Sequence, residues 1–267
     1  MQIIHNYDKF KVVDYLKSGQ KNLIVYNCGL GDTIMFLPYY KALCKMFPDI
    51  EFNLRADNQS EFFYDYYNNV YYYDYVFYLH AIFNEKIVKY QAYTKPECNC
   101  LFEMGIPYDK NLEYSYQLPH EKIDGFENVV GISFFNSCFP QYLNCREEVA
   151  KKIWYELKDN GFTPINLFKP ILKDADKNPL NSIYDFIDNS VDSSYGLVKM
   201  INAMSSMNGI AAVATGNFHY AMTVFPEKTL YLKKDFKKDF FTNKDVLSLD
   251  TVNPDYGILK EWINRLK

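Results

Sequence analysis

The chain has 267 residues, a formal net charge of −4 and 48% hydrophobic residues, enough for one large or two ordinary domains with real cores. This charge gives no electrostatic reason to expect a nucleic-acid partner, because such binding rests on neutralising phosphates with Lys and Arg. No apolar run approaches the roughly 20 residues of a membrane span, so we expect peripheral membrane contact at most.

The first half of the chain alternates strand and helix patterns, which is typical of a parallel α/β sheet. Its expected elements are strands at 23–27, 50–54 and 70–79 and helices at 33–47, 60–68 and 85–104. Gly105 and Pro107 end the last of these helices. The pattern predicts one α/β domain in this half.

The second half repeats the alternation. Its expected elements are strands at 129–134, 163–168, 183–187, 209–214 and 229–232, the last strand of the chain, and helices at 146–160, 195–207, 217–224 and 256–266. Gly161 is well placed as the residue that follows a helix end. Because a polar stretch at 120–128 separates the halves, we expect domains at 1–124 and 125–267.

The terminal helix carries an apolar stripe formed by Leu259, Trp262, Ile263 and Leu266. Such a helix must dock somewhere, and the first domain is a candidate. Six scattered cysteines and the lack of a signal peptide at the N-terminus predict reduced thiols in a cytoplasmic protein. No metal site is expected, because Cys98 and Cys100 lack a second Cys/His pair at suitable spacing.

One motif, Gly29-Leu30-Gly31-Asp32, follows the strand at 23–27. It therefore lies at the carboxyl edge of a sheet, where open α/β folds bind ligands. The simpler interpretation is a turn whose aspartate caps the next helix. The motif is not a P-loop, because no Gly-Lys-Ser/Thr follows, and Ile34 replaces the third glycine of a dinucleotide site.

A second motif, Thr215-Gly216-Asn217-Phe218-His219, follows the strand at 209–214. Thr215 can cap the helix, and Gly216 lets backbone N–H groups approach a ligand closely. The positive end of the helix favours a diphosphate, which His219, one turn along, would also face. The alternative is a capped helix with a packed imidazole.

Together these motifs resemble the heptosyltransferase-like glycosyltransferases (glycosyltransferase family 9). In that family a glycine turn, an aspartate, a proline six residues on and an Ala-Leu helix follow the first strand, as in Gly29 to Leu43. The later strand leads to an Asp-Thr/Ser-Gly-x-x-His turn, like the segment at 209–221. Two departures are Ala214 in place of the usual aspartate and the lack of Lys-x-Trp-Pro in 137–146.

The resemblance implies a GT-B architecture, in which two Rossmann-like domains with parallel sheets face a central cleft. Domain 1–124 would be the acceptor side with the catalytic base, and domain 125–267 would bind a nucleotide diphosphate sugar. The implied reaction is inverting, metal-independent transfer of a hexosyl or heptosyl group to a hydroxyl of a glycan, glycolipid or protein acceptor. No cofactor is implied.

The resemblance also implies site residues. Asp32 would be the general base, after the turn formed by Gly29 and Gly31. The residues implied to bind the donor and its phosphates are Thr215, Gly216, Asn217, His219 and Arg146. A nucleotide-sugar-binding protein with little or no transferase activity is the alternative, because of the two departures. A dinucleotide-dependent oxidoreductase is disfavoured by Ile34.

Overall fold

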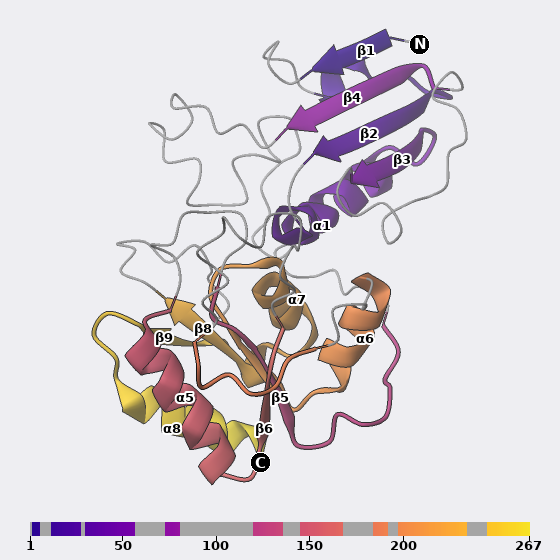
Figure 1. The fold of residues 1–267 in the computed structure, drawn as a ribbon. Helices are drawn as coiled ribbons and strands as arrows, with labels where there is room; N and C mark the ends of the chain where they lie inside the picture. The colour runs from indigo at the N-terminus through magenta and orange to yellow at the C-terminus, as the bar shows by residue number, and fades with distance from the viewer. Residues whose placement is uncertain are drawn as a thin grey trace. The chain divides into compact units, whose positions relative to one another are not determined.

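The computed structural model describes residues 2–5, 12–27, 30–56, 73–80, 120–135, 145–167, 184–191, 197–233 and 245–267. These residues belong to two compact units, and the boundary between the units falls after residue 116. Each unit contains its own parallel sheet (Figure 1). The fold class is therefore α/β, as the alternating patterns predicted.

The first unit contains a parallel sheet with the strand order β1-β4-β2-β3. Its strands are β1 (Gln2–His5), β2 (Lys21–Asn27), β3 (Glu51–Ala56) and β4 (Tyr75–His80). The chain runs from β2 outward to β3 and then returns to the opposite side of β2 as β4. The carboxyl ends of β2 and β4 therefore form a topological switch point, where open α/β sheets bind ligands.

Helix α1 (Leu30–Met46) connects β2 to β3, and a short 3₁₀ helix, η2 (Val12–Tyr15), precedes β2. The Tyr40 hydroxyl donates a hydrogen bond to the Phe52 carbonyl at 3.0 Å, which ties α1 to β3. The Tyr15 ring packs edge-on against Tyr75 and Phe77 of β4. These contacts hold the helices against the sheet that leads to the switch point.

The second unit contains a five-stranded parallel sheet with the order β6-β5-β7-β8-β9. Its strands are β5 (Val129–Ser133), β6 (Thr163–Asn166), β7 (Gly209–Ala212), β8 (Thr229–Lys233) and β9 (Leu247–Asp250). Its helices are α5 (Glu147–Asp159), α6 (Leu197–Ser206), α7 (Gly216–Val224), η8 (Pro226–Lys228) and α8 (Tyr256–Leu266). Helices α5 and α8 lie on one face of the sheet, and α6 and α7 lie on the other (Figure 1).

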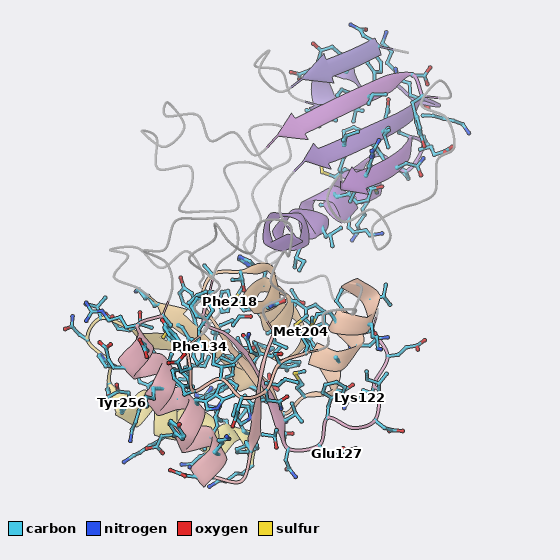
Figure 2. The ribbon with its side chains drawn as sticks, viewed as in Figure 1. Lys122, Glu127, Phe134, Met204, Phe218 and Tyr256 are labelled. Carbon is cyan, nitrogen blue, oxygen red and sulfur yellow. The ribbon has the colours of Figure 1, made fainter. Side chains whose placement is uncertain are left out.

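Along each strand of this sheet, successive side chains point to opposite faces. Phe134, just after β5, packs with Trp154 of α5 in the core between the sheet and the helices α5 and α8. On the opposite face, Phe218 of α7 stacks on Tyr231 of β8 with ring centroids 4.6 Å apart. Phe134 and Phe218 are labelled in Figure 2. Burial of the sheet on both faces explains why its central strands β5 and β7 are almost wholly apolar.

Helix α5 ends in a Schellman motif. Gly161 has a φ of +85°. Its N–H donates to the Lys158 carbonyl, and the N–H of Phe162 donates to the Leu157 carbonyl, both at 3.0 Å. The side chains of Phe162 and Leu157 are buried in the same core cluster, as this motif usually requires. The predicted role of Gly161 is confirmed.

The sequence predicts neither β1 nor β9, because its first predicted strand begins at residue 23 and its last ends at residue 232. β1 and β9 have four residues each, and each pairs with a single neighbour at an edge of its sheet. Short edge strands carry too few residues for a clear periodic signal. The other expected strands and helices within the described residues agree to within about five residues at each end, except for the strand at 183–187; the helices expected at 60–68 and 85–104 lie outside them.

The strand expected at 183–187 is wrong. Residues 184–187 form a turn in which the Ile187 N–H donates to the Tyr184 carbonyl at 2.9 Å. The parallel pairing in this segment is a single bridge between Ser190 and Asn166. Tyr184, Phe186 and Ile187 pack against the outside of the core cluster, so their apolar pattern reflects partial burial of a turn.

The apolar stripe of α8 packs into the core of the second unit itself. All its side chains are almost fully buried with residues of β5, β8 and β9. The Trp262 indole N–H also donates to the Lys228 carbonyl of η8 at 3.0 Å. Burial of the stripe therefore does not require the first domain, which was the candidate docking face.

The polar stretch at 120–128 is hydrogen-bonded to the second unit. The Glu121 N–H donates to the Asn202 side chain, and the Ile123 N–H donates to the Ser206 hydroxyl at 2.8 Å. Both acceptors belong to α6. The domain boundary between 124 and 125 stays a prediction. Among the described residues, no helix combines the length and apolar character needed to cross a membrane.

Candidate functional site

The glycine turn of the first unit lies where β2 ends and α1 begins. β2 ends at Asn27, and Asn27 lies opposite His80, the last residue of β4, in the register of the sheet. Helix α1 begins at Leu30, so Gly31 and Asp32 occupy its first turn. Gly29 and the side chain of Asp32 lie outside the part of the chain that the structure describes.

The helix begins three residues earlier than the sequence indicated. Asp32 is therefore inside the first turn, and the interpretation of Asp32 as the residue that precedes and caps the helix is wrong. A carboxylate in a first turn is still favoured by the helix dipole. The helix continues through Pro38, although a proline in a helix interior costs about 3 kcal/mol. Ile34 and Leu37, both buried, help to hold this segment in place.

The second turn lies at the carboxyl edge of the second sheet. The chain leaves β7 at Ala212, and the Val213 N–H donates to the Ser133 carbonyl at 2.9 Å. Thr215 then adopts an extended conformation, and its hydroxyl oxygen accepts a hydrogen bond from the Phe218 N–H at 3.4 Å. The predicted cap by Thr215 is confirmed.

The first turn of α7 leaves two backbone donors open. Within the described residues, the N–H groups of Gly216 and Asn217 make no hydrogen bond. Both residues are partly exposed. Unpaired N–H groups at the positive end of a helix form a favourable environment for an anion. These N–H groups are therefore suited to donate hydrogen bonds to a phosphate group.

Asn217 makes a side-chain contact that the sequence did not reveal. Its Nδ2 donates to the Ser133 Oγ at 2.8 Å. Ser133 is the last residue of β5 and is buried. A hydroxyl that ends an otherwise apolar strand, at the ligand-binding edge of a sheet, was the available signal for this residue.

His219 is buried in α7 next to Phe218, with ring centroids 5.5 Å apart. Burial lowers the pKa of His219 to about 3, because a charged imidazole would lose its hydration. The imidazole is therefore neutral at physiological pH. Its predicted contact with an anion stays a prediction, and such a contact would use a neutral N–H group.

Arg146 precedes α5, so it begins a helix at the same edge of the sheet. Its Nη1 lies 3.5 Å from the Val252 carbonyl and 3.9 Å from a carboxylate oxygen of Glu148. The side chain is thus directed to the turn after β9. No contact between Arg146 and the first turn of α7 is found in the described part of the chain.

Comparison with known proteins places the fold. No family model matches the sequence, and no curated protein matches it. A glycosyl transferase family 9 structure from Veillonella parvula superposes with a TM-score of 0.63 at 9% identity, covering 94% of this chain and 98% of that one. The iron-containing glycosyltransferase TibC from enterotoxigenic E. coli gives a TM-score of 0.63 at 13% identity, covering 94% and 76%.

The E. coli heptosyltransferase WaaC, in complex with ADP-2-deoxy-2-fluoro heptose, gives a TM-score of 0.51 at 12% identity over 92% of this chain and all of that one. These identities are too low to transfer an activity, but the match extends over both units. The chain thus has the α/β fold of the GT-B type found in family 9 glycosyltransferases, which is the fold that its two motifs predicted.

Proposed function

We propose that this chain is a glycosyltransferase that moves a sugar from a nucleotide diphosphate sugar to an acceptor hydroxyl. The observation that carries the proposal is the first turn of α7, where the N–H groups of Gly216 and Asn217 are open at the carboxyl edge of a parallel sheet. A fold shared with glycosyltransferases supports the same reaction class.

The donor in this proposal is anchored through its diphosphate. One TibC structure contains ADP-D-β-D-heptose, and one WaaC structure contains ADP. At the start of α7 the backbone donors and the helix dipole would compensate the negative charge of the leaving diphosphate. This compensation requires no cation, so we propose metal-independent transfer by residues 125–267, with a hexosyl or heptosyl donor.

Asp32 is the proposed general base on the acceptor-side domain, 1–124. The acceptor oxygen forms a bond to the anomeric carbon while its proton passes to the Asp32 carboxylate and the bond to the nucleotide diphosphate breaks. This single displacement inverts the anomeric configuration. A position in the first turn of α1 favours the ionised form that a base requires. The acceptor is a hydroxyl of a glycan, glycolipid or protein.

The proposal is tested first by donor binding. Thermal unfolding is measured with ADP, UDP, GDP and CDP, because a ligand at 100 times its dissociation constant stabilises a protein by about 2.7 kcal/mol. The diphosphate that binds is then supplied as a panel of its sugar conjugates, and transfer and hydrolysis are measured. Release of nucleotide that depends on an added acceptor supports the transferase.

A nucleotide-sugar-binding protein is the second candidate. It is favoured by Ala214, which replaces the usual aspartate. It is also favoured by the position of Arg146, whose Nη1 donates to the Val252 carbonyl and, within the described residues, brings no positive charge to the first turn of α7. Calorimetric binding of the donor with no turnover would support this candidate. Binding of NAD(P) instead would point to an oxidoreductase, which the buried Ile34 disfavours.

A further inference from the structure

Ser133 is a buried hydroxyl that the proposed reaction has not used. Only 1% of this residue is exposed, and the four residues before it in β5 are valines, glycine and isoleucine. Burial of a hydroxyl costs free energy unless the group is hydrogen-bonded. Its partner is the side chain of Asn217, whose Nδ2 donates to the Ser133 Oγ at 2.8 Å.

A second hydrogen bond joins the same two segments. The Val213 N–H donates to the Ser133 carbonyl at 2.9 Å. Ser133 therefore holds the turn at 213–217 at its beginning, through the backbone, and at its end, through the Asn217 side chain. A turn that is fixed at both ends loses little freedom when a ligand binds, which favours affinity.

The Asn217 amide has a donor to spare. A primary amide carries two N–H donors, and Ser133 accepts one of them. The other has no acceptor among the residues that the structure describes, and Asn217 is partly exposed. With the open backbone N–H groups of Gly216 and Asn217, it makes a third donor at the positive end of α7.

We propose that Ser133 is a positioning residue for the donor. It orients the Asn217 amide so that the second N–H of Nδ2 reaches an oxygen of the nucleotide diphosphate. Ser133 itself does not touch the donor. This inference rests on the proposed function, because it requires a diphosphate at the start of α7.

The test is a double-mutant cycle on nucleotide affinity. ADP, UDP, GDP and CDP are titrated calorimetrically into the wild-type protein, Ser133→Ala, Asn217→Ala and the double variant. We expect each single substitution to weaken binding about tenfold, the effect of one hydrogen bond to a charged group. The double variant should bind no more weakly than Asn217→Ala, because Ser133 acts through Asn217.

Two further variants separate positioning from a purely structural role. Tyr220→Phe removes another buried hydrogen bond of α7, from the Tyr220 hydroxyl to the Ile201 carbonyl at 3.3 Å, and should lower Tm without changing affinity. Asn217→Asp places a carboxylate in the first turn, which favours the helix but repels a diphosphate. We expect its Tm to be unchanged or higher and its affinity at least tenfold lower.

Unchanged affinity in Ser133→Ala, or additive losses in the double variant, would overturn the inference. If Ser133→Ala does not fold, Asn217→Ala and Asn217→Asp decide: wild-type affinity in both rejects the proposal. If the wild-type protein binds none of the four nucleotides, the proposed function fails together with this inference. If it binds one and the variants do not differ, the inference alone fails.

Discussion

The two strand–turn–helix junctions of this chain differ in the charge that they place in the first turn of the helix. Helix α1 has 17 residues and carries an acid, Asp32, in its first turn. Helix α7 has nine residues, no acid in its first turn and a neutral threonine cap. A carboxylate offsets the positive end of the dipole of α1, whereas no acidic side chain in the first turn of α7 offsets the positive end of its dipole.

The difference assigns opposite chemistry to the two turns. A first turn with a carboxylate repels an anion and can accept a proton, which suits a base next to an acceptor hydroxyl. A first turn with open N–H groups attracts an anion, which suits a diphosphate. The same local fold can therefore supply both halves of a transfer reaction, and each half can be tested separately.

The largest expected effect follows from removing the proposed base. Asp32→Asn keeps the size of the side chain but removes the proton acceptor, so transfer should fall by about 10²- to 10⁴-fold while diphosphate affinity is retained. Initial rates and calorimetry measure the two quantities. Asp49→Asn, an exposed acid beyond the other end of α1, is the matched control and should keep full activity. Near-normal turnover in Asp32→Asn would exclude the base assignment.

The next expected effect is a loss of stability from a substitution in β7, the strand that leads to the first turn of α7. A Cβ at Gly209 would lie 2.4 Å from the Leu266 Cδ2 and 2.6 Å from the Lys228 carbonyl oxygen. Because a backbone atom cannot move aside cheaply, Gly209→Ala should lower the free energy of unfolding by about 3 kcal/mol. Denaturant titration measures this change.

Gly131→Ala is the control for this substitution. Its Cβ would meet the ends of two side chains, Leu167 at 2.7 Å and Met207 at 2.9 Å, which can shift. We expect a loss of about 1 kcal/mol. Equal losses in the two alanine variants would show that the contact with the Lys228 backbone is not what constrains the start of β7.

The lowered pKa of the buried His219 in α7 predicts that the free energy of unfolding depends on pH. His219 has a folded pKa of about 3, whereas an unfolded chain has the ordinary value of about 6.5. Between these values the unfolded state binds more protons, so stability is lost as pH falls from about 6.5 towards 3. Between pH 7.5 and pH 5.0, His219 should therefore lower the free energy of unfolding by about 2 kcal/mol.

The measurement is urea unfolding at both pH values for the wild-type protein and for His219→Gln, which does not titrate. The variant should lose about 2 kcal/mol less than the wild-type protein over this interval. An equal pH dependence in both proteins would mean that burial does not lower the pKa of His219 in the folded state. The contrast between the two turns would then be weaker than the structure indicates.

Much of this fold was accessible from the sequence because its patterns are local. Strands such as β2 and β7 are short apolar runs followed by glycine turns, and α5 and α8 show clear apolar stripes. The errors fall where local pattern and environment disagree. β1 and β9 are short edges, and Tyr184 to Ile187 is an apolar turn that covers a core.

The candidate site was only partly accessible for a different reason. A cap such as Thr215 is specified within four residues, so the sequence predicts it. The contact of Ser133 with Asn217 joins residues 84 positions apart, and no local rule brings them together. Likewise, the burial of His219 depends on how the sheet and helices pack, so its neutral state could not be predicted from spacing.

The smallest expected effect concerns the cap that keeps the second turn in shape. The hydroxyl of Thr215 accepts from the Phe218 N–H at 3.4 Å, a long hydrogen bond. Thr215→Ala should therefore lower the free energy of unfolding by about 0.5 to 1 kcal/mol, near the low end for loss of a cap. Thr215→Ser keeps the hydroxyl and should lose much less. If the serine variant is as unstable as the alanine variant, the threonine methyl group matters more than the cap, and the second turn owes its shape to packing and to Ser133.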